Sequence, residues 1–260
     1  MLHAKLLGSG PPLVILHGLF GSLDNWQTLA RRFAEPDPRF GESRTCVLLD
    51  LRNHGRSPHL DAHGYAEMAA DVAAYLADNW IHEAAVLGHS MGGKVAMRLA
   101  LDEPDLVSEL IVVDMGPRAY GRGHDEVFRA MRSLPLSQNR SRAELDDRLR
   151  ATIPEAGVRQ FLLKNLRREP TGYAWKLNLD VIERDYPRIL EAVTAETPYG
   201  GPALFVRGGE SGYVRDEDWP AIRQLFPAAE LATVAGAGHW VHAERPEALY
   251  ALVRGFLAAE

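Results

Sequence analysis

Gly88-His89-Ser90-Met91-Gly92 joins an apolar run at 84–87 to a helical pattern that begins at Gly93. A strand that ends in a sharp turn into a helix pushes the side chain at the turn out above the sheet, and small residues let the two backbones approach. This arrangement is a nucleophile elbow. Ser90 is therefore the candidate nucleophile of the chain.

Short apolar runs alternate with segments of helical spacing on both sides of this turn. The predicted strands span 13–16, 46–49, 84–87, 110–113, 203–206 and 231–234, and the predicted helices span 25–33, 65–79, 94–101, 219–225 and 246–257. Such alternation is typical of a mostly parallel sheet covered by helices on both faces. The sequence therefore predicts an α/β fold with a doubly wound sheet.

Residues 117–201 interrupt this alternation. Within them, Ser141-Arg142-Ala143-Glu144 has the form of a capping box, and four apolar residues after Pro154 have helical spacing: Val158, Phe161, Leu162 and Leu166. Ligands of such sheets lie beyond the carboxyl ends of the strands, close to where the interruption begins. We therefore expect a core of residues 1–116 and 202–260 and a helical lid at 117–201, the alternative being a helical pair far from the site.

The composition favours a soluble enzyme that acts on small molecules. The 260 residues are 46% hydrophobic, enough for one substantial core, and Cys46 is expected to be a buried structural thiol. The net charge of −6 argues against a nucleic-acid partner. The first apolar run, 13–16, is too short for a membrane span or a signal peptide. We expect a cytoplasmic protein, either a monomer or a small homo-oligomer.

A serine hydroxyl needs a general base, and the base needs a carboxylate that orients it. His239 is the candidate base, because it follows the last predicted strand after Ala235-Gly236-Ala237-Gly238 and precedes the last helix. Structural roles are expected for four other histidines near the same turns: His17, His54, His89 and His242.

Two positions compete for the carboxylate. Asp114 follows strand 110–113, whereas the more usual place is after the next strand, where the chain has Glu210-Ser211-Gly212 instead of an aspartate. Position alone favours Asp114 over Glu210. Asp216 and Asp218 are further candidates.

A tetrahedral intermediate needs donors for its oxyanion, and backbone N–H groups supply them after the nucleophile and after an early strand. The candidates are Met91 and, in the loop His17-Gly18-Leu19-Phe20, Leu19. Phe20 is an alternative donor or a wall of the acyl pocket, and Trp240 is a candidate substrate-binding residue.

The remaining polar motif is expected to support the structure of the site rather than to take part in catalysis. The segment from Asp50 to Ser57 holds an acid, arginines and a histidine, and we expect a hydrogen-bonded turn that supports the oxyanion loop. Zinc-ligand spacing, a phosphate-binding loop and a dinucleotide-binding motif are all absent from the sequence. No metal or other cofactor is implied.

Four segments together resemble the α/β-hydrolase superfamily over essentially the whole chain: His17-Gly18, Asp50-x-Arg52-x-His54-Gly55-x-Ser57, Gly88-His89-Ser90-Met91-Gly92-Gly93 and Gly238-His239. Their longer contexts are similar to small bacterial esterases of the YbfF type and to abhydrolase-domain esterases. The resemblance implies an α/β-hydrolase fold with a lid inserted after strand 6. It also implies ester and acyl-thioester hydrolysis and a catalytic acid after that strand, which corresponds to Asp114.

We therefore expect a serine hydrolase that cleaves a small-molecule acyl ester or thioester. Ser90 would attack, His239 would carry the proton, Asp114 would orient His239, and the Leu19 and Met91 amides would hold the oxyanion. A C–C bond hydrolase, a lactonase or a perhydrolase would use the same triad. An alternative of another class is a hydrolase-fold binding protein with negligible turnover.

Overall fold

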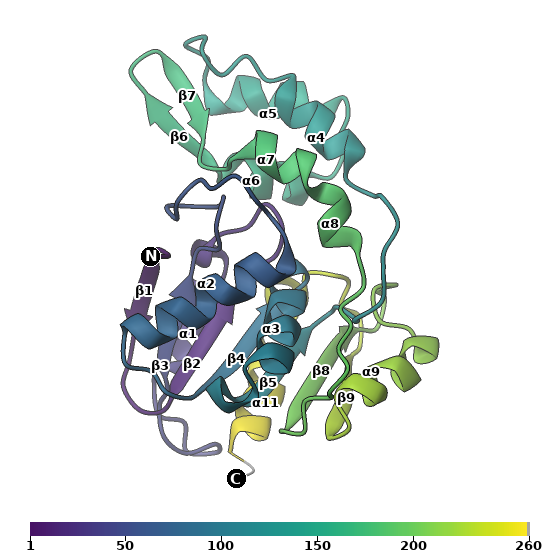
Figure 1. The fold of residues 1–260 in the computed structure, drawn as a ribbon. Helices are drawn as coiled ribbons and strands as arrows, with labels where there is room; N and C mark the ends of the chain where they lie inside the picture. Colours follow the sequence, from purple (N-terminus) through teal and green to yellow (C-terminus); the bar gives the residue numbers. More distant parts are fainter. Residues whose placement is uncertain (259–260) are drawn as a thin grey trace.

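Seven strands form one sheet in the computed structural model, which describes residues 1–258 (Figure 1). In spatial order they are β1 (Ala4–Leu7), β3 (Thr45–Leu49), β2 (Pro12–Leu16), β4 (Ala84–His89), β5 (Val107–Val113), β8 (Ala203–Gly208) and β9 (Ala229–Val234). All neighbours are parallel except β1, which runs antiparallel to β3. The predicted doubly wound, mostly parallel sheet of the α/β-hydrolase fold is confirmed.

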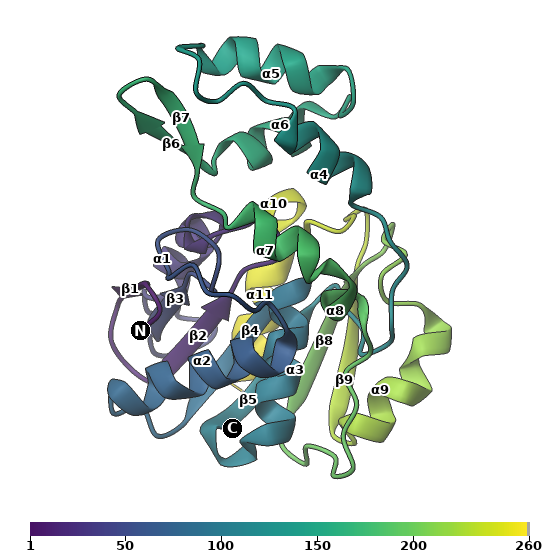
Figure 2. The ribbon, with the colours of Figure 1, turned by 45° about the horizontal axis from the view of Figure 1, so that its top comes forward.

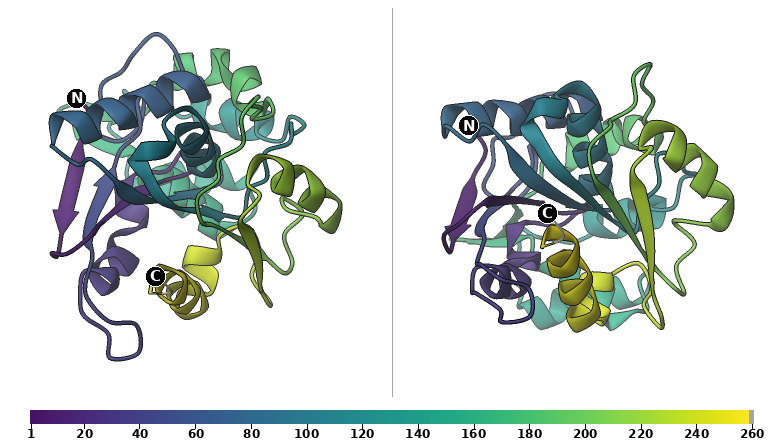
Figure 3. Two further views of the ribbon diagram at one scale, coloured as in Figure 1. Left: turned by 60° about the horizontal axis from the view of Figure 1, so that its bottom comes forward. Right: turned by 90° about the horizontal axis from the view of Figure 1, so that it is seen from below.

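Helices cover both faces of the sheet. In the view from below in Figure 3, α2 (Tyr65–Asp78) and α3 (Met91–Asp102) lie on one face, and α1 (Gln27–Phe33) and α11 (Pro246–Leu257) lie on the other. The other helices outside residues 117–201 are α9 (Trp219–Leu225), α10 (Val241–Glu244) and the short 3₁₀ helices at Leu23–Asn25, Pro104–Leu106 and Asp216–Asp218.

The central strands are nearly continuous apolar runs because each of their faces is buried. Along β2, Val14 and Leu16 pack into the cluster beneath α2 and α3, whereas Leu13 and Ile15 pack into the cluster beneath α1 and α11. This alternation fixes the register of the strand, since a shift by one residue would exchange the two faces.

The chain leaves the sheet after β5 and returns at β8. Residues 117–201, called the insert below, contain α4 (Asp125–Arg132), α5 (Arg142–Arg150), α6 (Ala156–Leu163), β6 (Leu166–Glu169), β7 (Gly172–Trp175), α7 (Leu179–Arg184) and α8 (Tyr186–Leu190). Figures 1 and 2 show these elements stacked above the carboxyl ends of the parallel strands. The capping box is present at α5, where the Glu144 carboxylate accepts from the Ser141 amide at 2.8 Å.

Both ends of the insert are tied to the core by one side chain. Lys94, on α3, is fully buried, and its ammonium donates to the backbone carbonyls of Arg118, at 2.7 Å, and Glu191. The same group lies 4.8 Å from the centre of the Tyr120 ring. These contacts place the two connections of the insert side by side on α3.

Some sequence expectations are corrected. Leu166 does not continue the helix of Phe161 and Leu162 but begins β6, because α6 ends at Leu163. The β6–β7 hairpin makes the insert mixed rather than purely helical. The edge strand β1 was not expected, and the helix at 25–33 begins only at Gln27. The strand before the insert, the sixth in the family's numbering, is β5, the fifth along this chain.

None of the helices described between residues 1 and 258 has the length and apolar character needed to cross a bilayer.

Candidate active site

The turn between β4 and α3 is sharp and strained. Ser90 has φ 53° and ψ −121°, a backbone conformation that residues with a Cβ rarely adopt. The two glycines beside it are required by close backbone contacts. A Cβ on Gly88 would lie 2.1 Å from the Gly92 carbonyl oxygen, and one on Gly92 would lie 2.5 Å from that of His17. This geometry is that of the predicted elbow and raises the Ser90 hydroxyl above the sheet.

Three predicted residues meet at this turn. His239 Nε2 lies 3.0 Å from Ser90 Oγ, and His239 Nδ1 lies 2.7 Å from Asp114 Oδ2. They come from the loops that follow β4, β5 and β9, whose carboxyl ends share one edge of the sheet. Asp114 is fully buried, so its carboxylate interacts with the imidazole away from solvent.

Asp114 is held by several donors. Its oxygen Oδ1 accepts from the Gly208 amide at 3.0 Å, and Oδ2 accepts from the Ser211 hydroxyl as well as from His239. Its own amide donates to the Val206 carbonyl at 2.7 Å, and its φ is 52°. These contacts fix which carboxylate oxygen faces the imidazole.

The competing carboxylates lie elsewhere. Glu210 is exposed, and its side chain does not reach His239. Asp216 pairs with Arg207 at 2.7 Å, and Asp218 pairs with Arg118 at 3.1 Å. Of the four acids considered from the sequence, Asp114 alone contacts the imidazole.

The imidazole of His239 is positioned from two further sides. The Tyr213 ring stacks on it at 3.8 Å between ring centres and 16° between planes. The backbone carbonyl of His239 lies 2.9 Å from His89 Nε2. Burial lowers the pKa of His89 well below its ordinary value, so the neutral ring supplies one N–H donor, to this carbonyl. Tyr213 and Ser211 were not assigned roles from the sequence, because their partners lie on other loops.

The loop after β2 passes directly against Ser90. A Cβ on Gly18 would lie 3.2 Å from the Cβ of Ser90. The Phe20 amide donates to His54 Nε2 at 3.3 Å, so this candidate donor already has an acceptor. Among residues 1–258, the amides of Leu19 and Met91 have no such acceptor. Met91 directly follows Ser90, and Leu19 directly follows Gly18, which packs against Ser90.

The predicted supporting turn at 50–57 braces this loop. The Asp50 carboxylate accepts from the Leu23 amide at 2.8 Å and from the Arg56 amide at 2.9 Å. His17 Nε2 accepts from the Leu51 amide at 3.0 Å. Burial lowers the pKa of His17, which keeps this nitrogen free to accept.

A cavity of about 880 Å³ opens above Ser90 and His239. The core contributes Leu19, Phe20 and Trp240 to its wall, and the insert contributes apolar side chains, among them Val127, Val158, Phe161 and Leu162. Phe161 and Trp240 contact each other, with ring centres 5.8 Å apart. The predicted substrate-binding residues Phe20 and Trp240 therefore line the same cavity as the serine.

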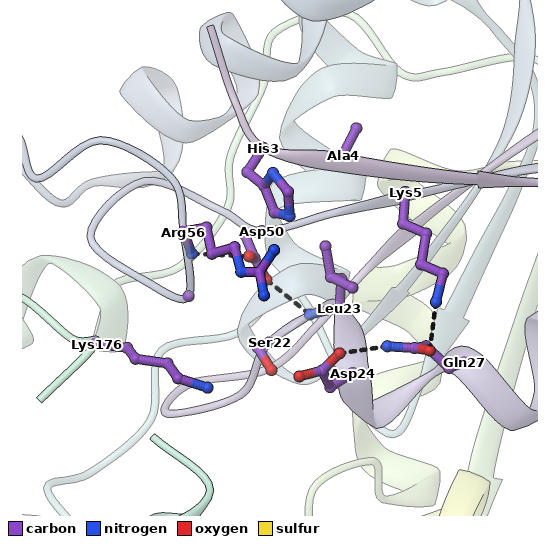
Figure 4. A pocket seen from close by; sticks show the side chains of 11 residues that line it. His3, Ala4, Lys5, Ser22, Leu23, Asp24, Gln27, Asp50, Arg56 and Lys176 are labelled. Atoms are coloured by element: carbon purple, nitrogen blue, oxygen red, sulfur yellow. Dashed lines mark hydrogen bonds between the residues drawn. The ribbon is translucent and has the colours of Figure 1, made fainter. Parts of the chain in front are cut away.

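A second cavity, of about 330 Å³, is lined mostly by polar groups, including Lys5, Arg56 and Lys176 (Figure 4). Figure 4 shows Lys5 bonded to Gln27 and the Asp50 carboxylate bonded to the Leu23 amide. Ser90, Asp114 and His239 do not line this cavity. Ser90 and His239 line the larger cavity.

Comparisons with known proteins agree with the fold described above. A family model described as α/β hydrolase fold matches residues 11–246. The chain is 42% identical over 242 residues to the sn-1-specific diacylglycerol lipase ABHD11 of Xenopus laevis, covering 91% of this chain and 76% of that protein. It is 37% identical to the esterase YbfF of Escherichia coli, covering 95% and 92%. A solved structure of a marine microorganism esterase superposes with a TM-score of 0.93 at 38% identity, covering 98% of each chain.

Proposed function

Because this chain belongs to the α/β-hydrolase family and its relatives are named esterases and a lipase, we propose that it is a serine hydrolase of carboxylic esters or acyl thioesters. The observation that carries the proposal is the continuous hydrogen-bonded series from Ser90 through His239 to Asp114. The fold alone would not carry it, since many chemistries share this fold.

In the acylation step, Ser90 Oγ attacks the carbonyl carbon of the substrate. Its proton passes to His239 Nε2, 3.0 Å away, and the resulting imidazolium is stabilised by the Asp114 carboxylate. The carbonyl oxygen becomes an oxyanion, which the Leu19 and Met91 amides stabilise. When the intermediate collapses, the proton on Nε2 goes to the departing alcohol or thiol and an acyl-enzyme remains.

Deacylation repeats the steps with water. His239 accepts a proton from the water, the water oxygen attacks the acyl carbon, and the proton returns to Ser90 Oγ as the carboxylic acid leaves. The apolar side chains that the insert places over the cavity support its role as a lid and as a wall of the acyl pocket.

The test is hydrolysis of p-nitrophenyl esters from acetate to palmitate and of a short acyl thioester. We expect serine-dependent turnover that is lost in Ser90→Ala and His239→Ala, while the exposed-site variant Glu210→Gln keeps wild-type activity. Absence of turnover on every ester and thioester would overturn the proposal and favour a C–C bond hydrolase or a binding protein.

A further inference from the structure

Phe20, in the oxyanion loop, has a backbone conformation that its surroundings must maintain. Its φ is 59°, in the left-handed region that residues with a Cβ rarely adopt. The turn around it is closed by the Gly21 amide, which donates to the Gly18 carbonyl at 2.9 Å. Such a conformation persists only where neighbouring groups hold it in place.

One of these groups is His54, which lies in the turn after β3 and is fully buried. Its Nδ1 lies 3.0 Å from the Arg52 carbonyl and therefore carries the ring proton, so that Nε2 accepts from the Phe20 amide at 3.3 Å. Burial lowers the pKa of His54, which keeps Nε2 unprotonated at neutral pH. The core thus holds the N–H of Phe20.

The other group comes from the insert. Asn165 lies between α6 and β6 and is only 3% exposed. Its side-chain Nδ2 donates to the Phe20 carbonyl at 2.7 Å and also lies 3.2 Å from the carbonyl of Leu162 in α6. Its own carbonyl accepts from the Lys176 amide at 2.8 Å. Asn165 therefore connects the segments around α6 and β7 to the oxyanion loop.

We propose that Asn165 is a positioning residue that, together with His54, fixes Phe20 from both sides and thereby aims the Leu19 amide at the oxyanion. This inference rests on the proposed function. It makes the insert part of the catalytic machinery, because a shift of α6 moves the group that holds the oxyanion loop. Asn165 touches neither Ser90 nor His239, so it acts through the loop.

Asn165→Asp is the test variant, because it keeps the size of the side chain and replaces the donor by an oxygen facing the Phe20 carbonyl. Asn178→Asp is the matched control. Asn178 also belongs to the insert and donates to the core, at 3.1 Å to Asn53 Oδ1, but it does not contact the oxyanion loop. Both variants are compared with wild type on p-nitrophenyl butyrate and with a trifluoromethyl ketone, whose tetrahedral adduct places an oxyanion beside the loop.

Loss of a whole oxyanion donor costs about 10²- to 10³-fold in kcat, so a displaced donor should cost about 10- to 100-fold. We expect Asn165→Asp to lower kcat by this factor with little change in KM and to weaken inhibition by the ketone in proportion. Asn178→Asp should change neither quantity by more than about threefold, and Asn165→Gln, which keeps the donor, should recover part of kcat.

Wild-type kcat and ketone affinity in folded Asn165→Asp would overturn the proposal. Loss of folding in both Asn165 variants would also overturn it, because Asn165 would then serve the stability of the insert. Failure of the proposed function gives a different result, namely a wild-type protein that hydrolyses no ester or thioester.

Discussion

Replacing Asp114 by asparagine tests how the imidazole of His239 is oriented. The Gly208 amide donates to Oδ1, so an oxygen must remain at that position and the new amide nitrogen must take the position of Oδ2. That NH₂ group would face His239 Nδ1, now 2.7 Å from Oδ2, while the Ser211 hydroxyl can rotate its proton away. The ring must then carry its proton on Nε2, facing Ser90, and can no longer accept one.

The expected loss of activity comes from holding the His239 imidazole in the wrong tautomer. An asparagine at the acid position of such a triad lowers kcat by about 10⁴-fold, which corresponds to about 5 kcal/mol in the activation free energy. The structure predicts a loss of this size at pH 7 for Asp114→Asn, with a far smaller effect on KM.

The assay is steady-state hydrolysis of p-nitrophenyl butyrate, with Glu210→Gln as control because Glu210 is exposed and does not contact His239. Circular dichroism and thermal unfolding establish that both variants are folded. An Asp114→Asn enzyme within tenfold of the wild-type kcat would refute the reasoning, as would an equal loss in Glu210→Gln.

Three further predictions concern stability and specificity. Burial lowers the pKa of His63 from 6.5 to about 4, so between these pH values the unfolded state binds the proton and the folded state does not. In urea unfolding, protonation of His63 should lower the free energy of unfolding by up to about 3 kcal/mol as pH falls from 6.5 to 4. The loss of stability over the same pH range should be smaller in His63→Phe. Gly88→Ala should lose at least about 3 kcal/mol in the same assay, because its Cβ would meet the Gly92 carbonyl; wild-type stability would contradict this. Phe161→Ala should lower kcat/KM for p-nitrophenyl butyrate about fivefold, because about 1 kcal/mol of apolar contact with the acyl chain is lost. An unchanged kcat/KM would show that Phe161 does not contact the acyl chain.

The sheet was predictable because its central strands are buried on both faces. Such strands are short apolar runs, and every one predicted from a run is present. β1 escaped prediction because it has only four residues, Ala4–Leu7, which include Lys5 and of which none is buried. Pro170 and Gly172, on either side of Thr171, were the available signal for the β6–β7 hairpin, whose turn lies at 170–171.

The positions of Ser90, His239 and Asp114 were predictable because each follows a strand whose carboxyl end faces the same edge of the sheet. The contacts that orient them were not. Ser211 is an ordinary polar residue in the sequence, and its contact with Asp114 joins positions far apart along the chain. The same holds for Asn165 and its contact with the Phe20 carbonyl in the neighbouring loop. Only the folded arrangement brings these pairs together.

The role of Ser90 as the nucleophile is the central claim, and covalent labelling tests it most directly. The protein is treated with a p-nitrophenyl alkylphosphonate, and the adduct is mapped by mass spectrometry of the intact chain and its peptides. The account predicts one adduct, on the peptide that contains Ser90, with loss of esterase activity in step with labelling and no adduct in Ser90→Ala. An active esterase that remains unlabelled at Ser90, or one labelled at another residue, would contradict it.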